Sequence, residues 1–410
     1  MPRTALPLVL VAGLLAARAA EAQPAPPALP AERVGEVLAP PPPAPHQVWV
    51  ADYLLRRTAL LDGDSGRFLG MLSTGTGAIA PVFSQARGEI YLPETHYSRG
   101  SRGERSDVVT IYDVATLAPV AEVAIPPRRA DIVHGVGLAT LLDDGRFLAL
   151  YNFTPATSVS IVDVAERRFV GEIATPGCSL VYGAGPRRFL MLCSDGSLLL
   201  VALDESGAEA SRARSEKLSD PIADPVTEKP VRHGDEWLFV TFSGEVRPVD
   251  VGGEALRFGP PWSLLDDADR AASWRIGGTQ HLALHEASGR LYALVHRGGP
   301  DGHKEPGTEI RVYDVVARAP VQTIALRNLL AAFLVQQIGA RSDALLWVLE
   351  RLVPSPGVDS IAVSQDAAPL LFGVSRQAGT VGVWDARSGA FRRHLENVGL
   401  APGVLQAPWR

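Results

Sequence analysis

The sequence predicts an all-β fold, a seven-bladed β-propeller with a small, partly helical insertion between the last two blades. Short apolar strands that end in Asp recur along the chain, at spacings of 51, 50, 41, 46, 64 and 71 residues. Most are followed by a turn and another apolar strand. Repeats of ~40–50 residues with several short strands are typical of propeller blades, whereas stacked solenoids have shorter, more regular repeats. The recurring residues are Asp62, Asp113, Asp163, Asp204, Asp250, Asp314 and Asp385.

Residues 1–22 have the pattern of an export signal. Arg3 precedes an apolar run over Ala5–Leu15, and Ala20-Glu21-Ala22 matches a cleavage site. The apolar run is far shorter than the ~20 residues of a membrane span, so we expect a cleaved signal peptide and a periplasmic protein without a transmembrane span. A retained anchor is the alternative, but no Cys lies near the cleavage site to carry a lipid.

Residues 23–46 are rich in proline, including the run Pro40–Pro43. Such a segment lacks the apolar content to pack and favours extended geometry, so we expect a flexible spacer before a propeller over residues 47–410. The formal net charge of the chain is −6. This value argues against nucleic-acid binding, which requires a basic surface.

A long polar loop separates two strands of the second repeat. It holds Arg99, Arg102 and Arg105, interspersed with Gly and Ser. A hairpin needs as few as two loop residues, so this loop is longer than folding requires, and long loops often carry function. Three cations in seven positions would suit an acidic partner, whereas a solvated loop is the alternative.

The two cysteines of the chain, Cys178 and Cys193, flank a Gly/Pro turn. Adjacent antiparallel strands would bring them together, and export favours their oxidation, so the sequence predicts a disulfide. Closing a loop of about 15 residues in this way adds ~3 kcal/mol of stability in the chain-entropy description. Two isolated thiols are too few ligands for zinc.

Histidines provide no strong sign of a metal or catalytic site. His281 and His285 are four residues apart in a strand-like pattern and would share a face, but no third ligand lies nearby in the sequence. We also find no nucleophile–base pair. We therefore expect no catalytic, cofactor-binding or metal-binding residues in this chain.

The stretch at about 327–356 is the expected insertion. It contains two apolar runs, split by Gly339-Ala340-Arg341-Ser342-Asp343, and each run is too short to span a bilayer. Its periodicity permits a helical hairpin, although LLWVLERL also fits a strand. Its apolar side chains are too many for a free surface loop. We expect them to meet a partner or cover the channel rather than pack on the propeller itself.

Several segments resemble one known family. The stretch YSRGSRGERSDVVTIYD, residues 97–113, closely resembles the heavy chain of the tryptophan tryptophylquinone-dependent methylamine and aromatic amine dehydrogenases. NFTPATS at 152–158 and DSIAVSQD at 359–366 are also similar, and the resemblance covers roughly residues 48–405. We interpret NFTPATS as a tight strand connection in which Pro155 fixes the backbone. The family's heavy chains pass more directly than this chain across 327–356.

The resemblance implies a function. In that family a separate light chain carries tryptophan tryptophylquinone, a primary amine is oxidised to an aldehyde and ammonia, and electrons pass to a small copper protein. Two heavy and two light chains assemble, and the heavy chain helps to wall the substrate channel. An aromatic residue of its first loop shapes the entrance. Here that loop is shorter, and Tyr53 is the candidate, with Arg99, Arg102 and Arg105 as possible channel or light-chain contacts.

Two other functions remain open from the residues alone. The chain would also suit a stand-alone exported propeller that acts as a binding module or as a metal-dependent hydrolase. A propeller that binds pyrroloquinoline quinone is less well supported, because adjacent cysteines are missing and the seven tryptophans show no blade period.

Overall fold

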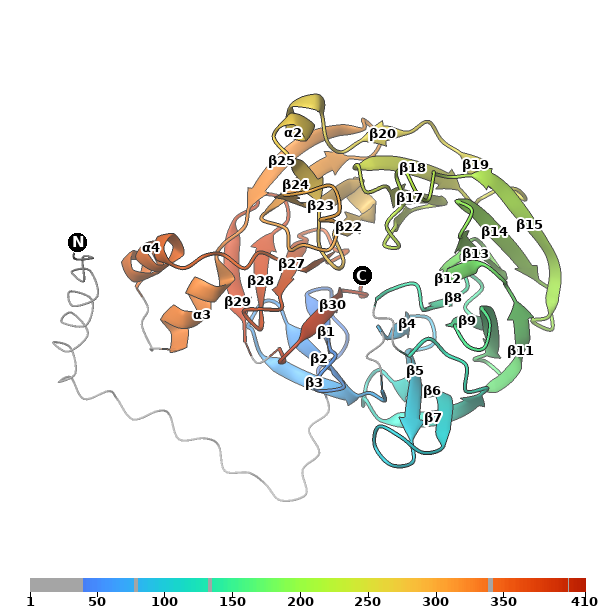
Figure 1. Ribbon diagram of the computed structural model, residues 1–410. Helices are drawn as coiled ribbons and strands as arrows, with labels where there is room; N and C mark the ends of the chain where they lie inside the picture. Colours follow the sequence, from blue (N-terminus) through green and yellow to red (C-terminus); the bar gives the residue numbers. More distant parts are fainter. Residues whose placement is uncertain (1–39, 77–79, 132–134, 338–341, 397) are drawn as a thin grey trace, which may run out of the picture. The chain divides into compact units, whose positions relative to one another are not determined.

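The computed structural model describes residues 40–410 except 77–79, 132–134, 338–341 and 397. The expected signal peptide and residues 23–39 of the Pro-rich segment lie outside the described residues. The described strands form seven antiparallel sheets around a common axis (Figure 1), which confirms the seven-bladed propeller. None of the described helices is long and apolar enough to cross a membrane.

The blades follow the chain, except that the last strand completes the first sheet. Blade one contains β1 (Gln47–Asp52), β2 (Arg57–Asp62), β3 (Phe68–Ser73) and β30 (Pro402–Gln406). Blade two contains β4 (Val82–Ser84), β5 (Glu89–Tyr97), β6 (Arg105–Asp113) and β7 (Pro119–Ile125). Blade three contains β8 (Ala139–Leu141), β9 (Phe147–Asn152), β10 (Ser158–Asp163) and β11 (Arg168–Ala174). Blade four contains β12 (Cys178–Gly183), β13 (Arg188–Cys193), β14 (Ser197–Leu203) and β15 (Glu209–Lys217).

The later blades carry additional elements. Blade five contains β16 (Val231–His233), β17 (Glu236–Val240), β18 (Glu245–Asp250), β19 (Arg257–Phe258) and β20 (Trp262–Ser263). Helix α2 (Asp267–Ala271) precedes blade six, which contains β21 (Trp274–Ile276), β22 (Leu282–His285), β23 (Arg290–Arg297), β24 (Glu309–Asp314) and β25 (Ala319–Ala325), with a 3-10 turn at Glu286–Ser288. Helices α3 (Leu329–Gln337) and α4 (Asp343–Leu352) precede blade seven, which contains β26 (Ser360–Val363), β27 (Leu370–Ser375), β28 (Thr380–Asp385) and β29 (Phe391–Leu395).

The recurring aspartates mark the same place in every blade. Each ends the third strand from the axis or directly follows it. In each described blade the Oδ1 atom of this residue accepts a backbone N–H of the following turn at 2.8–3.2 Å. An Asp side chain that satisfies turn N–H groups favours the tight turn to the fourth strand. The repeat in the sequence is therefore a repeat of turns.

The strand order creates two unlike faces. We name the strands A to D outwards from the axis. Because they alternate in direction, the B–C loops and the connections between blades emerge on one side, which we call the connecting face. The A–B and C–D turns, with the recurring aspartates, form the opposite turn face. Blade closure depends on β30, which pairs with β1 as the innermost strand of blade one and brings the end of the chain near the centre of the ring (Figure 1).

The helices α3 and α4 form the expected insertion between the last two blades. The segment LLWVLERL lies within α4 and is helical, and the Ser342 hydroxyl accepts the N–H of Leu345 at 3.3 Å as an N-cap. Helix α3 packs against β28, and Leu329, Ala331 and Ala332 are buried. This half of the segment is part of the blade-seven core, contrary to the expectation that the apolar side chains serve mainly a partner or a lid.

Candidate functional site

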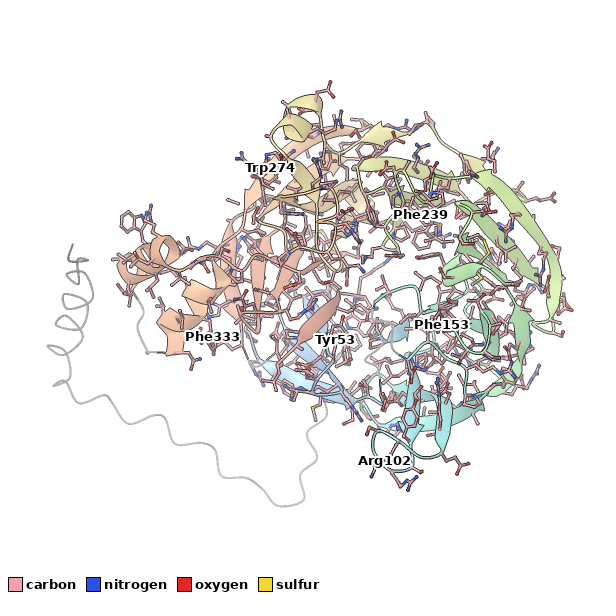
Figure 2. All side chains as sticks on the ribbon, in the orientation of Figure 1. Tyr53, Arg102, Phe153, Phe239, Trp274 and Phe333 are labelled. Atoms are coloured by element: carbon pink, nitrogen blue, oxygen red, sulfur yellow. A yellow bond between two sulfur atoms is a disulfide. The ribbon has the colours of Figure 1, made fainter. Side chains whose placement is uncertain are left out.

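The connecting face collects the residues that the sequence singled out. Tyr53 lies in the β1–β2 loop, the arginine-rich loop joins β5 to β6, and residues 153–157 join β9 to β10. The insertion is also a connection of this face. Figure 2 shows Arg102 at the tip of its hairpin, away from the centre of the ring, whereas Tyr53 lies closer to the centre. The candidates therefore share a face without forming one cluster.

The arginine-rich loop holds its own shape. The Ser98 N–H donates to the Glu104 carbonyl at 3.0 Å, and the Glu104 N–H donates to the Ser98 hydroxyl at 3.1 Å. Gly103 has φ +101°, and a Cβ there would lie 2.4 Å from the Ser98 hydroxyl, so glycine is required. Arg99 and Arg102 are exposed. The loop thus presents two cations to solvent on an ordered tip.

Arg105 has a different role from the other two arginines. Its guanidinium donates to both oxygens of the buried Asp107 carboxylate at 2.9 and 2.8 Å, and also to the Arg129 carbonyl at 2.8 Å. The hydrogen bonds with Asp107 raise the pKa of Arg105. A side chain held in this way fixes the base of the hairpin and is a poor contact for a partner.

A buried polar network below the loop escaped the sequence analysis. Arg129 donates from Nε to the Thr95 hydroxyl at 3.1 Å and from Nη2 to the Thr76 carbonyl at 3.0 Å, and its N–H donates to Asp107. Burial lowers the pKa of Arg129 to about 10, although Asp107 opposes the shift, so the side chain stays charged at neutral pH. The network joins the hairpin to the connections on either side of blade two. The sequence does not distinguish Arg129 from neighbouring Arg128, because the contacts of Arg129 are made with residues distant in the chain.

Tyr53 is partly buried rather than displayed. A Cβ on Gly403 would lie 2.2 Å from its ring, so the ring packs directly over the backbone of β30. Burial raises the pKa of Tyr53 to about 12, with Arg376 opposing and Asp359 adding to the shift. The phenol is therefore neutral at physiological pH. The exposed apolar side chains of this loop are its neighbours Leu54 and Leu55, at 69% and 40% exposure.

A buried carboxylate holds these leucines beside a third one. Asp52 accepts the N–H of Leu55 at 2.7 Å and those of Leu400 and Ala401 at 2.5 and 2.9 Å, which ties the β1–β2 loop to the β29–β30 connection. Leu400 is 68% exposed. We call Leu54, Leu55 and Leu400 the leucine patch. Sequence reasoning missed it because Leu400 lies 345 residues beyond Leu55.

Exposed apolar side chains concentrate on the connecting face. Among the described residues, fourteen large apolar side chains are exposed, and nine of them belong to loops or connections of this face. Four of the others lie on outer strands and one lies on the turn face. A contiguous exposed apolar patch indicates a protein contact, and within this set the leucine patch is the group whose loops are tied together. The nine are Leu54, Leu55, Phe153, Ile222, Leu334, Trp347, Val348, Leu352 and Leu400.

The disulfide is confirmed. Cys178 and Cys193 are direct partners across β12 and β13, with Cα atoms 3.9 Å apart. It fastens the connecting-face end of blade four. The 152–158 segment is a tight connection from β9 to β10, as expected, and the Asn152 amide donates to the Ser158 and Ser160 hydroxyls.

The described histidines do not converge on a metal site. His281 is fully buried, its Nε2 lies 3.0 Å from the Thr227 hydroxyl, and burial lowers its pKa to about 3. His285 instead contacts Ser288 and the Asp366 carbonyl. The described part of the chain contains no group of three or more His, Cys, Asp or Glu side chains arranged to hold a metal ion.

Comparisons with known proteins identify the family. The family model described as methylamine dehydrogenase heavy chain matches residues 48–338 and 347–407. The chain belongs to the methylamine dehydrogenase heavy chain family. Only 339–346 of the α3–α4 region lie outside the match.

Individual relatives agree with this assignment. The chain is 27% identical to the methylamine dehydrogenase heavy chain of Paracoccus versutus over 374 residues, covering 90% of this chain and 81% of the relative. It is 27% identical to that of Methylophilus methylotrophus over 350 residues, covering 84% and 78%. A functionally unknown protein from Desulfotomaculum acetoxidans shares the fold with a TM-score of 0.57 at 10% identity, covering 88% of this chain and 98% of that one. Membership makes the chain an amine dehydrogenase subunit and implies a light-chain partner.

Proposed function

We propose that the chain is the heavy subunit of a periplasmic quinoprotein amine dehydrogenase and that its light chain docks on the connecting face. The concentration of exposed apolar side chains on that face carries this proposal. A buried apolar centre with a charged rim is the usual composition of a protein interface. The leucine patch would supply apolar contact, and Arg99 and Arg102 would pair with acidic groups of the light chain.

The division of labour follows the family. The light chain would carry tryptophan tryptophylquinone, and with water a primary amine would be converted to an aldehyde and ammonia. The two electrons released would pass singly to a small copper protein. This chain would hold two light chains in a heterotetramer with a second copy of itself and would wall the substrate channel. Because Tyr53 is packed over β30, Leu54 and Leu55 are the side chains of the first loop that would face the partner.

The docking face is tested by co-expression with the light chain and size-exclusion chromatography with light scattering. Leu54→Glu together with Leu55→Glu should prevent assembly, because each buries a charge in the interface. Phe68→Glu is the matched control, since Phe68 is 48% exposed on outer strand β3 of the same blade. Equal loss from both changes, or assembly with both, would contradict the proposed face.

The cation contribution is tested with Arg99→Ala and Arg102→Ala while Arg105 is retained. The double variant should slow association, and the difference from wild type should shrink at high salt, because exposed charges mainly steer the encounter. Arg67→Ala on the turn face is the control. An unchanged association rate at low salt would remove the loop from the interface.

The site of catalysis is tested with the purified chain alone. It should neither reduce a redox dye with methylamine or an aromatic amine nor absorb as a quinone. Adding the light chain should produce both signals. Amine oxidation by the isolated chain would show that catalysis does not depend on the partner.

A further inference from the structure

A cavity of about 420 Å³ lies along the axis of the propeller. Residues of the inner strands of several blades line it, Val181, Leu282, Ile361 and Leu405 among them. The side chains of these four residues are almost fully buried. Cavities of roughly 300–1,000 Å³ with apolar walls and a few polar groups are typical small-molecule sites. This volume is large enough for a compact organic molecule.

The end of the cavity toward the turn face is neutralised. Arg232 lines it, and its guanidinium donates to both oxygens of Asp143 at 2.9 and 2.8 Å, with Asp235 at 3.4 Å. Ala407 and Pro408, which follow β30, also line this end. A ligand at this end would contact Arg232, whose charge is already balanced by Asp143, and backbone atoms. A charged ligand would therefore be bound only weakly there.

The end toward the connecting face carries a cation with spare donors. Lys229 precedes β16 and lines the cavity, and its side chain is 12% exposed. The ammonium of Lys229 pairs with one carboxylate among the described residues, that of Glu228, at 3.3 Å. An ammonium has three N–H donors, so two remain for a ligand. The Glu228 side chain is itself 51% exposed.

The other polar side chains of the lining already have partners. The Tyr182 hydroxyl donates to the Glu228 carbonyl, and the Trp237 indole donates to the Gly183 carbonyl. Gln280 donates to the carbonyls of Ile361 and Leu405 and accepts the Leu405 N–H. These bonds stabilise the wall of the cavity. Within the described residues they leave Lys229 as the cation available to a ligand.

The two histidines near Lys229 add little positive charge. Burial lowers the pKa of His303, and the ammonium groups of Lys229 and Lys304 lower it further. Burial likewise lowers the pKa of His281, with Lys229 as the next contribution. Both imidazoles are therefore mainly neutral at pH 7, and the charged groups at this mouth are Lys229, Lys304 and the Glu228 carboxylate, which acts to raise the pKa of His303.

We propose that the axial cavity binds a small organic monocarboxylate, with its apolar body between the inner strands and its carboxylate on the Lys229 ammonium. This site lies beyond the proposed amine dehydrogenase role and belongs to this chain alone. A protonated amine, with the opposite charge, would be repelled from the same position.

The proposal is tested by calorimetric titration of the isolated chain with three probes of one carbon skeleton: phenylacetate, 2-phenylethanol and 2-phenylethylamine. Phenylacetate should bind at least about tenfold more tightly than the alcohol, because a charge-assisted hydrogen bond is the stronger kind. The amine should bind more weakly still. Equal affinity for all three, or no binding of phenylacetate at millimolar concentration, would overturn the proposal.

Variants identify the anchor. Lys229→Met keeps the length of the side chain and should weaken phenylacetate by about 10–100-fold while leaving the alcohol unchanged. Lys229→Arg keeps the charge and should retain most of the binding. Lys304→Met, an exposed cation of the next loop, should change the affinity less than about threefold. Unchanged binding by a folded Lys229→Met, or equal losses in the Met and Arg variants, would overturn the assignment. The titration requires no light chain. Its result therefore stays interpretable even if the light chain does not dock on the connecting face.

Discussion

In each blade, one aspartate stabilises the turn between the third and fourth strands. Asp163 shows the arrangement most fully, because its side chain is buried and binds on two sides. Oδ1 accepts the N–H groups of Ala165 and Glu166, and Oδ2 accepts two hydrogen bonds from Arg146 at 2.9 and 2.7 Å. Burial acts to raise the pKa of Asp163, but the bonds from Arg146 and the backbone outweigh it and lower the pKa.

Replacing Asp163 should therefore be costly. Asp163→Ala should lower the free energy of unfolding by about 2 kcal/mol or more, because two N–H groups and a guanidinium lose their acceptor. Asp163→Asn keeps an acceptor for the turn and should cost less. Urea unfolding measures both. Asp204→Ala, at an exposed equivalent position with no arginine partner among the described residues, should have a smaller effect. Equal losses at the two sites would show that burial of the aspartate is unimportant.

His46 should make stability depend on pH. Its Nδ1 lies 2.8 Å from Asp64 and its Nε2 lies 3.3 Å from Asp366, so it joins the start of the propeller to blades one and seven. Burial lowers the pKa of His46, but Asp64, Asp366 and the Ala368 carbonyl together raise it above 6.5. A raised folded-state pKa adds stability that is complete below the unfolded pKa, near 6.5, and is lost as pH rises through the folded value.

The measurement compares wild type with His46→Gln by urea unfolding between about pH 5 and pH 9. Wild type should be the more stable protein at low pH, and the difference should decline above pH 6.5. A difference that grows with pH would contradict the ion-pair explanation.

Among the elements, the α3–α4 pair has two distinct surfaces. Leu329 of α3 is 1% exposed and belongs to the blade-seven cluster with Trp384. On α4, Trp347, Val348, Arg351 and Leu352 are exposed at helical spacing, and the Arg351 guanidinium lies 3.5 Å from the centre of the Trp347 ring. The inner helix belongs to the fold, and the outer helix presents an apolar stripe.

Matched substitutions should separate the two surfaces. Leu329→Ala should lower the free energy of unfolding by about 2–5 kcal/mol, because it leaves a cavity in a packed core. Trp347→Ala should change it by less than about 1 kcal/mol, since it removes only an exposed cation–π contact. Denaturant unfolding measures both. Cooperative loss of stability in Trp347→Ala would mean that α4 is part of the core.

For the whole molecule, closure of the ring depends on β30. Leu405 is fully buried in the cluster shared by blades one and seven, whereas Leu400, five residues earlier, is exposed in the leucine patch. Leu405→Asp should lower the free energy of unfolding by more than about 3 kcal/mol, because it buries an unpaired charge.

The same change at the nearby exposed position provides the control. Leu400→Asp should leave urea unfolding unchanged and should reduce light-chain assembly if the connecting face is the docking surface. A stable Leu405→Asp variant would show that the ring holds together without its last strand.

Much of the fold could be predicted because its signals are local. Each recurring aspartate bonds to N–H groups two to four residues ahead, so the turn and its sequence pattern coincide. The cysteine pair is likewise separated by 15 residues and one hairpin. The insertion was located by its length, but burial alone distinguishes α3 as core and the outer stripe of α4 as surface.

The sequence by itself determined the number of blades, the disulfide and the long arginine-rich loop, since those features repeat or lie within one hairpin. Only the tertiary structure decided that Arg105 is held by Asp107 while Arg99 and Arg102 are free to meet a partner. It also decided that β30 closes blade one and that Lys229 is among the residues that line the axial cavity. For β30 and the cavity the physical reason is distance along the chain, because the groups that meet there lie tens to hundreds of residues apart. Arg105 and Asp107 are only two residues apart, but the burial of Asp107 and the contact of Arg105 with the Arg129 carbonyl depend on the fold.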